Sequence, residues 1–141
     1  MRADRGWTLT EPDLALIEQT LGIRLPRAYR QTMLAFPVPA CAGNYNTELW
    51  DNAPELITLN QELRAGRPFV APWPAEYFAL GTDAGGCTQA LSLSEGTVFW
   101  ADRCHLPAEG DRGRVREFAS WASEYVLCSL RKWGQTLFRS E

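Results

Sequence analysis

Hydrophobic residues recur with a helical period near the start of the chain. The Thr10 side chain can accept a hydrogen bond from a free backbone N–H of the first turn, and Asp13 stands at the reciprocal position of a capping box. Gly22 suits the left-handed exit from a helix. These signals predict a helix from Thr10 to Gly22. Its apolar face consists of Leu14, Ile17 and Leu21.

Two more helices are predicted before the middle of the chain. The second begins at Pro26, whose fixed φ suits a first turn, and it ends before Pro37 and Pro39. Residues 37–47 then form a long loop, a kind of segment that often carries function. Asn52 caps the third helix, and Gly66 with Pro68 closes it. Its inner side is predicted to hold Leu56, Leu59, Asn60 and Leu63, while Glu55, Thr58 and Glu62 face water or a partner.

After residue 76, hydrophobic residues recur with a period of two instead of the helical period. Residues 77–81 are apolar and aromatic, residues 82–86 form a glycine-rich turn, and residues 87–94 alternate as in a half-buried strand. Glu95 and Gly96 reverse the chain into a further strand at 97–101. The pattern predicts an antiparallel meander of three strands. A polar loop and a final helix over about 114–133 follow, with Val115, Phe118, Ala122, Tyr125, Val126, Ser129 and Trp133 on its core stripe.

The tryptophans divide by the element that holds them. Trp100, Trp121 and Trp133 lie on predicted strand or helix, and they are expected to pack in the core. Trp50 and Trp73 lie in predicted loops, where an exposed aromatic side chain favours recognition of a partner.

Length and composition bound the class of protein. The chain has 141 residues, of which 45% are hydrophobic, and this fits one α+β domain over residues 1–141. It has no apolar run long enough for a membrane helix, and its start lacks the apolar stretch of a signal peptide. We therefore expect a cytoplasmic protein without a membrane partner.

The net charge of −3 conceals an uneven distribution. Residues 31–102 carry two basic and eight acidic side chains, whereas both flanking segments are slightly basic. An acidic chain does not favour non-specific nucleic-acid binding, which depends on phosphate neutralisation. The block is either a solvated surface or a site for a basic partner. Its acids are Glu48, Asp51, Glu55, Glu62, Glu76, Asp83, Glu95 and Asp102.

Catalytic and metal-binding residues are sparse. The one histidine, His105, adjoins Cys104, and no cysteine pair has the close spacing typical of a zinc site. We expect free thiols, no metal and no cofactor, although spacing alone leaves a disulfide open. An enzyme built on Cys104 and His105, or on an Asp83–Asp102 pair, is the least favoured interpretation. The four cysteines are Cys41, Cys87, Cys104 and Cys128.

Several segments, in order, resemble the SUKH superfamily, which includes bacterial toxin-immunity proteins and a fungal cell-wall-synthesis regulator. Residues 21–29 are similar to its opening LG-x-x-LP-x-x-Y, and residues 78–86 to its central IG-x-D-x-G-G turn before an alternating strand. Asn60 and residues 118–121 also match, so the resemblance spans roughly residues 9–127. One departure is the loop over 36–45, which lacks the Asn-Gly-Gly turn common in relatives.

The resemblance implies a central, mainly antiparallel sheet with N-terminal helices and a long C-terminal helix packed around it. It also implies a non-catalytic module that binds a cognate protein toxin, with a nuclease as the suggested class of toxin. We expect a monomer or weak homodimer. A regulatory or scaffold adaptor is the alternative. The residues expected to bind the partner are Glu48, Asp51, Glu55 and Glu62 for charge, with Tyr45 and Trp50 as aromatic anchors.

Overall fold

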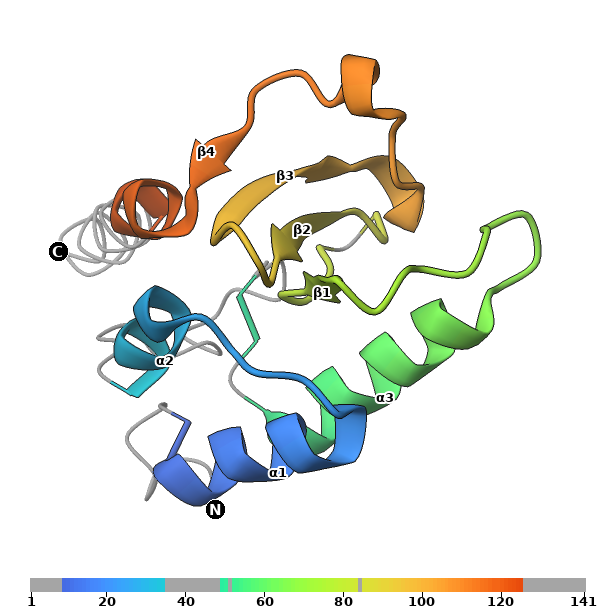
Figure 1. Ribbon diagram of the computed structural model, residues 1–141. Helices are drawn as coiled ribbons and strands as arrows, with labels where there is room; N and C mark the ends of the chain where they lie inside the picture. Colours follow the sequence, from blue (N-terminus) through green and yellow to red (C-terminus); the bar gives the residue numbers. More distant parts are fainter. Residues whose placement is uncertain (1–8, 35–48, 51, 84, 126–141) are drawn as a thin grey trace, which may run out of the picture.

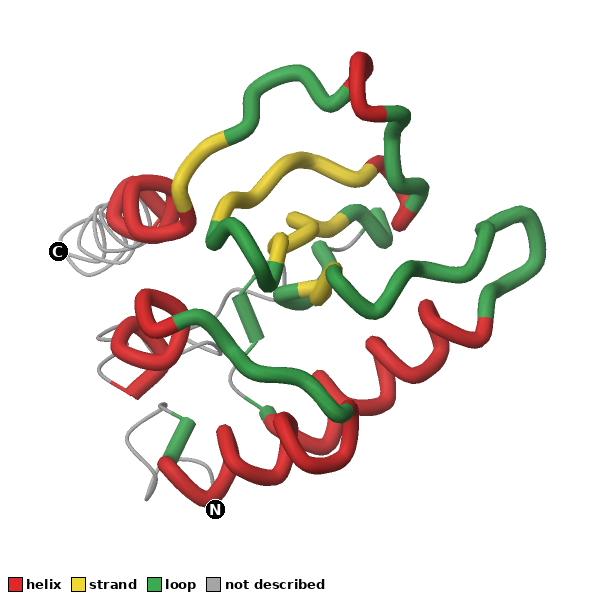
Figure 2. Tube along the Cα trace, viewed as in Figure 1, coloured by secondary structure: helices red, strands yellow, loops and turns green. Residues whose placement is uncertain are grey.

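The protein is an α+β fold in which helices pack around one antiparallel sheet, as the computed structural model shows (Figures 1 and 2). The structure describes residues 9–34, 49–50, 52–83 and 85–125. Three helices come first: α1 (Glu11–Leu21), α2 (Arg27–Leu34) and α3 (Ala53–Ala65). The strands are β1 (Tyr77–Ala79), β2 (Thr88–Ser92), β3 (Thr97–Ala101) and β4 (Arg116–Glu117). A last helix begins at 118 and continues through 125.

The predicted capping signals form at α1. The Asp13 N–H donates to the Thr10 side chain, and the Thr10 N–H donates to the Asp13 carboxylate, so the capping box is confirmed. Gly22 ends the helix in the left-handed conformation. Near that end, the Glu18 carboxylate accepts from the Leu25 N–H at 2.8 Å and from the Arg30 guanidinium at 3.2 Å. Glu18 therefore joins α1 to α2.

The buried faces of the second and third helices are as predicted, although α2 begins at Arg27, one residue after the predicted Pro26. On α2, Tyr29 is fully buried, and its ring meets Phe78 of β1 and Phe118 edge-on at centroid distances of 5.6 and 5.5 Å. One aromatic ring thus connects a helix, the sheet and the last helix. On α3, the Asn52 side chain accepts from the Glu55 N–H, which confirms this cap. The buried face of α3 includes Leu56, Leu59, Asn60 and Leu63, as expected.

The predicted meander is confirmed, and the structure adds a fourth strand to it. The strand order is β1-β2-β3-β4, and every neighbouring pair is antiparallel. The prediction of a helix from residue 114 is wrong at its start. Thr97 pairs with Glu117, and the Phe118 N–H donates to the Gly96 carbonyl, so β3 draws this segment into the sheet. Val115 is consequently 46% exposed instead of lying on a core stripe.

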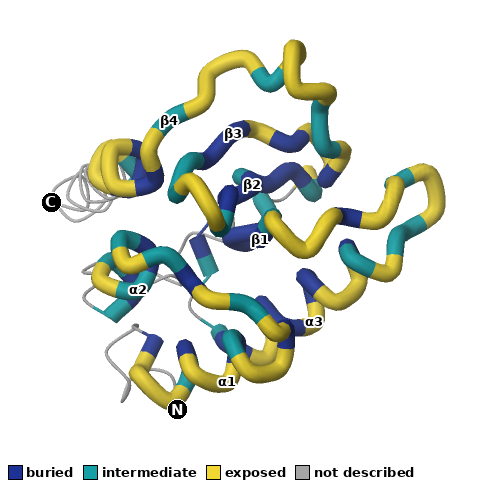
Figure 3. The backbone as a smooth tube through the Cα atoms, viewed as in Figure 1, coloured by how far each residue is buried: buried dark blue, intermediate teal, exposed yellow. Residues whose placement is uncertain are grey.

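Both faces of the sheet are covered, so the prediction of a half-buried strand is wrong for β2 (Figure 3). Leu91 and Val98 lie on the face that packs with α1, α2 and the last helix. Ala90 and Phe99 lie on the other face and pack with Leu59 and Leu63 of α3 and with Trp73. Thr88, Ala90 and Ser92 are small enough for this second layer to close over them.

Asn60 explains how α3 is attached to the outer edge of β1. Its side-chain carbonyl accepts from the Ala79 N–H at 2.7 Å, and its amide nitrogen donates to the Ala79 carbonyl at 3.1 Å. The same nitrogen also donates to the Leu56 carbonyl. The amide therefore replaces a neighbouring strand at this edge and satisfies backbone groups that would otherwise be buried without partners.

The prediction that tryptophans on strands and helices are buried and those in loops are exposed is wrong for two of them. Trp73 is buried, and its indole N–H donates to the Cys104 carbonyl at 2.9 Å, so it packs instead of recognising a partner. Trp100 lies on β3 but is 42% exposed, because the helices that cover Val98 do not extend over it. Trp121 is buried as expected, whereas Trp133 lies outside the described residues.

Several expectations concern residues that the structure does not describe. They are the long loop over 37–47, the thiols of Cys41 and Cys128, and the end of the last helix beyond 125. Among the described residues, no helix is long and apolar enough to cross a membrane.

Candidate functional site

The outer face of α3 borders a surface groove of about 530 Å³. Glu55, Thr58 and Glu62 recur along the helix at helical spacing, and all three are exposed. The facing wall comes from Trp50 and from the turn between β1 and β2. We call this the α3 groove. It is lined by Trp50, Pro54, Glu55, Thr58, Leu59, Glu62, Arg67, Thr82 and Gly86.

Trp50 is held in this wall by its backbone and by its ring. Its backbone N–H donates to the Leu80 carbonyl at 2.9 Å, and its indole N–H donates to the Thr82 carbonyl at 3.3 Å. The ring lies against Gly81, where a Cβ would stand 2.5 Å from an indole carbon. Glycine is therefore required at position 81, and the half-buried indole has a fixed position in the groove.

The charge along the groove is mainly acidic. Glu62 forms an ion pair with Arg67 at 2.7 Å, but both side chains remain substantially exposed, so the pair contributes at most about 1 kcal/mol. No described residue forms an ion pair with Glu55. A basic group of a partner would therefore meet one unpaired carboxylate and a second that is only weakly engaged.

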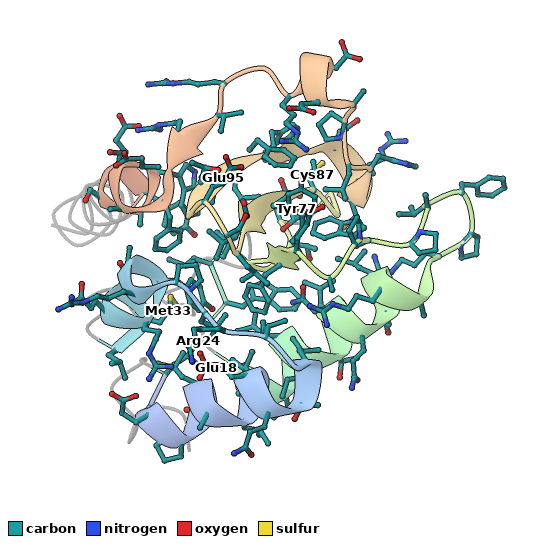
Figure 4. All side chains as sticks on the ribbon, viewed as in Figure 1. Glu18, Arg24, Met33, Tyr77, Cys87 and Glu95 are labelled. Carbon is teal, nitrogen blue, oxygen red and sulfur yellow. The ribbon has the colours of Figure 1, made fainter. Side chains whose placement is uncertain are left out.

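The acidic block of the sequence does not form a single face. Asp83 and Asp102 lie at the end of the sheet that holds Cys87, whereas Glu95 lies in the turn at the opposite end (Figure 4). Five strand residues separate the two ends, which corresponds to roughly 17 Å. Glu55 and Glu62 are thus the described acids of the block that share one helix face.

The two described thiols are buried beside this acidic end. The Cys87 thiol donates to Asp102 at 3.2 Å, and it accepts from the Arg103 N–H at the same distance. The Arg103 N–H alone would lower the pKa of Cys87, but burial, the Asp102 hydrogen bond and the charges of Asp83 and Asp102 together raise it. Burial likewise raises the pKa of Cys104. Both cysteines are free, as expected, and neither is activated as a nucleophile.

The structure keeps the Cys104 thiol apart from His105, whereas Asp83 and Asp102 both lie beside Cys87. The Cys104 thiol is buried and donates to the Gly86 carbonyl at 3.3 Å, whereas His105 is exposed and lines a different groove. Asp83 uses a carboxylate oxygen to accept from the Gly85 and Cys87 N–H groups, which orders the turn. Within the described residues, no group of three histidine, cysteine or acidic side chains is placed to hold a metal ion.

Phe69 is a candidate that the sequence reasoning missed. It stands in a short turn after α3 that is closed by reciprocal backbone hydrogen bonds between Arg67 and Val70. Its side chain is 97% exposed, and its φ is 67°, a left-handed value that is costly for a residue with a side chain. The available signal was an aromatic residue between Pro68 and Pro72, where turn chemistry places the chain at the surface.

A second groove of about 690 Å³ borders β3. Trp100, Val98 and Gln89 contribute from the sheet, and the chain between β3 and β4 forms the other wall. We call this the β3 groove. Its remaining residues are Asp102, His105, Leu106, Pro107, Asp111, Arg112, Gly113, Arg114, Arg116 and Trp121.

Three of the six residues expected to bind a partner meet at the α3 groove. They are Trp50, Glu55 and Glu62, which come from two separate segments. The other three, Tyr45, Glu48 and Asp51, lie outside the described residues. What the described chain offers at these positions is therefore an open acidic surface with an aromatic wall, suited to contact with another macromolecule.

Comparison with known protein families identifies the family of this chain. A family model for the SMI1/KNR4 family (SUKH-1) matches residues 8–127, and the chain belongs to that family. The resemblance inferred from the sequence is thereby confirmed. Proteins of this superfamily are known as immunity or regulatory proteins rather than as enzymes, and the family suggests a protein partner. No curated protein matches the chain.

Proposed function

We propose that this protein is a non-catalytic immunity protein that binds a cognate bacterial toxin through the α3 groove and blocks the toxin's activity. The observation that carries the proposal is the meeting of Trp50, Glu55 and Glu62 at one open groove. Tyr45, Glu48 and Asp51 belong to the proposed surface through their closeness to Trp50 in the sequence. Family membership supports the immunity role.

The chemistry of the groove favours a basic partner. Carboxylates at Glu55 and Glu62 attract a positive surface and accelerate the encounter, while the indole of Trp50 offers an apolar contact. Toxins that cleave nucleic acid carry basic active sites, because they bind phosphate. A nuclease toxin is accordingly the partner class that we propose.

Phe69 extends the proposed surface. Phe69 follows Arg67 by two residues, Arg67 lines the α3 groove, and the Phe69 side chain is almost fully exposed. Aromatic residues dominate binding energy at protein interfaces when they enter a partner's pocket. We propose that Phe69 is such an anchor and that burial in the complex offsets the cost of its exposure in the free protein.

The test is co-expression in a bacterial host with the toxin-domain protein encoded next to this chain. The wild-type protein should restore growth and co-purify with the toxin. The double variant Glu55→Lys/Glu62→Lys should weaken binding by about 10- to 100-fold, chiefly through slower association, and the loss should be smallest at high salt. Phe69→Ser should weaken binding through faster dissociation.

A matched control is the double variant Glu76→Lys/Glu95→Lys, which makes the same charge change at exposed positions outside the α3 groove. This control should protect as the wild type does. Equal loss in both double variants would show that only net charge matters, and the proposed surface would be wrong. Full toxicity in the presence of the wild-type protein would contradict the immunity role itself.

The second candidate is a regulatory or scaffold adaptor, and the family membership favours it as well. An adaptor would capture a housekeeping protein and would function without a toxin gene nearby. Affinity purification of the wild-type protein beside Glu55→Lys/Glu62→Lys separates the two candidates. A housekeeping partner that is lost in the variant, together with no protection against the neighbouring gene product, would favour the adaptor.

A further inference from the structure

The two sides of the sheet differ in how their backbone groups are satisfied. At β1, the outward N–H and C=O of Ala79 both bond to the Asn60 side chain. At β3, the strand β4 pairs only with Thr97 and Val98. Beyond Val98, this edge of β3 has no neighbouring strand within the part of the chain that the structure describes.

Along each strand, successive residues direct their N–H and C=O groups to opposite sides, and this alternation shows which backbone groups of β3 face its outer edge. The Leu80 N–H donates to the Gln89 carbonyl, so the polar groups of Gln89 face β1. Trp100 lies opposite Gln89 in the β2–β3 register, and its own N–H and C=O therefore face away from β2. The bond from the Phe118 N–H to the Gly96 carbonyl fits the same phase, because Gly96, Val98 and Trp100 alternate along the strand.

The β3 groove lies at this open edge. Figure 1 shows the chain between β3 and β4 as an arch beyond β3. Residues of β3 and of this arch line the groove. Arg112 anchors the arch, since its guanidinium lies 4.5 Å from the Phe99 ring centroid and donates to the Tyr77 hydroxyl at 2.5 Å. The indole of Trp100 is 42% exposed here, next to the unpaired backbone groups.

The charge of the groove is positive at the end near β4. Arg116 donates to the Glu124 carboxylate at 2.6 Å, and Arg114 acts on the same carboxylate. Both arginines lower the pKa of Glu124, so one carboxylate serves two guanidinium groups. At this end the two arginines exceed Glu124 by one positive charge, while Asp102 and Asp111 also line the groove.

We propose that the β3 groove binds an extended, acidic segment of a protein partner, which adds as a short strand to the free edge of β3 at Trp100. The backbone of the segment would pair with the Trp100 N–H and C=O, as in other sheet-edge recognition. An apolar side chain would cover the indole, and an acidic side chain would face Arg114. This surface is separate from the α3 groove and does not depend on the toxin.

The probe is a blocked hexapeptide of alternating valine and glutamate, added to the full-length protein. At saturation, hydrogen exchange at the Trp100 amide should slow by about tenfold or more, because its N–H gains a partner. Arg114→Glu should weaken binding by about tenfold. Arg27→Glu, the same charge change at an exposed position on α2, should bind as the wild type does.

Two variants of the hexapeptide distinguish strand addition from non-specific binding. One has lysine in place of glutamate, and the other is methylated at the backbone nitrogens that would face β3. Neither variant should bind. Equal binding of either peptide overturns the proposal, as does unchanged exchange at the Trp100 amide. Absence of binding at about 1 mM hexapeptide, the weak end of useful affinity, also overturns it.

Discussion

The indole ring of Trp50 occupies the space that a side chain at Gly81 would need. The nearest indole carbon lies 2.5 Å from an ideal Cβ, and the φ of Gly81 is 146°, a value that disfavours any other residue. Trp50 can therefore form the wall of the α3 groove only because Gly81 has no side chain.

Gly81→Ala is expected to destabilise the protein by about 3 kcal/mol, because the added methyl group collides with the indole and the backbone is strained. In a Trp50→Ala background, the collision disappears and the cost should fall to about 1 kcal/mol. Denaturant unfolding of the four proteins measures this coupling. Equal costs in both backgrounds would show that the two residues do not compete for space.

Asn60→Ala should cost about 2–4 kcal/mol of stability, since it leaves the Ala79 N–H and C=O buried without partners. The neighbouring Gln61 is exposed on the same helix, so Gln61→Ala should change stability by less than about 0.5 kcal/mol. Chemical denaturation with both variants tests this role. A small effect of Asn60→Ala would mean that water satisfies the edge of β1.

Tyr29→Phe is expected to leave the protein as stable or more stable by up to about 1 kcal/mol at neutral pH. The Tyr29 hydroxyl is buried, and no described residue accepts or donates a hydrogen bond to it. The substitution removes this polar group and keeps the ring contacts with Phe78 and Phe118. A loss of more than about 1 kcal/mol would reveal a hydrogen bond to the hydroxyl.

The same tyrosine predicts a loss of stability in alkali. Burial raises the pKa of Tyr29 far above its ordinary value of 10.0, so the unfolded chain releases this proton first as the pH rises. Below pH 10 the Tyr29 hydroxyl is protonated in both the folded and the unfolded chain, and the free energy of unfolding does not depend on it. Above pH 10 the free energy of unfolding decreases by about 1.4 kcal/mol per pH unit. The difference between wild type and Tyr29→Phe, measured by urea unfolding from pH 8 to pH 11, isolates this slope. A constant difference would contradict it.

Phe69→Gly should stabilise the free protein by about 1 kcal/mol, because glycine adopts the left-handed backbone without strain and no buried contact is lost. The thermal unfolding midpoint measures this gain. Val115→Gly provides a control, since Val115 is exposed without a left-handed φ, and this change should not stabilise the protein. A destabilised Phe69→Gly would show that the phenyl ring packs in the free protein.

The local pattern of the sequence was sufficient for α1, α2 and α3, because caps and apolar spacing act within a few residues. The same kind of pattern failed at Val115, which is exposed, because a two-residue strand occupies Arg116–Glu117 and the helix begins only at Phe118. Pairing with Thr97 and Val98 decides that segment, and contacts between distant segments leave no periodic signal. The prediction for β2 failed similarly, since a second covering layer depends on α3 and Trp73.

For the candidate site, helical spacing was enough to predict that Glu55 and Glu62 share an exposed face. The exposure of individual aromatic residues could not be derived from the type of element that holds them. Trp73 in a loop is buried between α3 and the sheet, whereas Trp100 on a strand lies beyond the covering helices. Phe69 required knowledge of the turn between Arg67 and Val70, which only the backbone geometry provides.

The inward-facing and outward-facing residues of α3 have different roles, and this has an evolutionary consequence. Leu56, Asn60 and Leu63 face inward and hold the sheet, whereas Glu55, Thr58 and Glu62 touch little of the fold. Substitutions on the outer row can accumulate at small cost to stability. A lineage whose partner diversifies could therefore change its recognition surface one residue at a time, while selection on folding acts on a different row of the same helix.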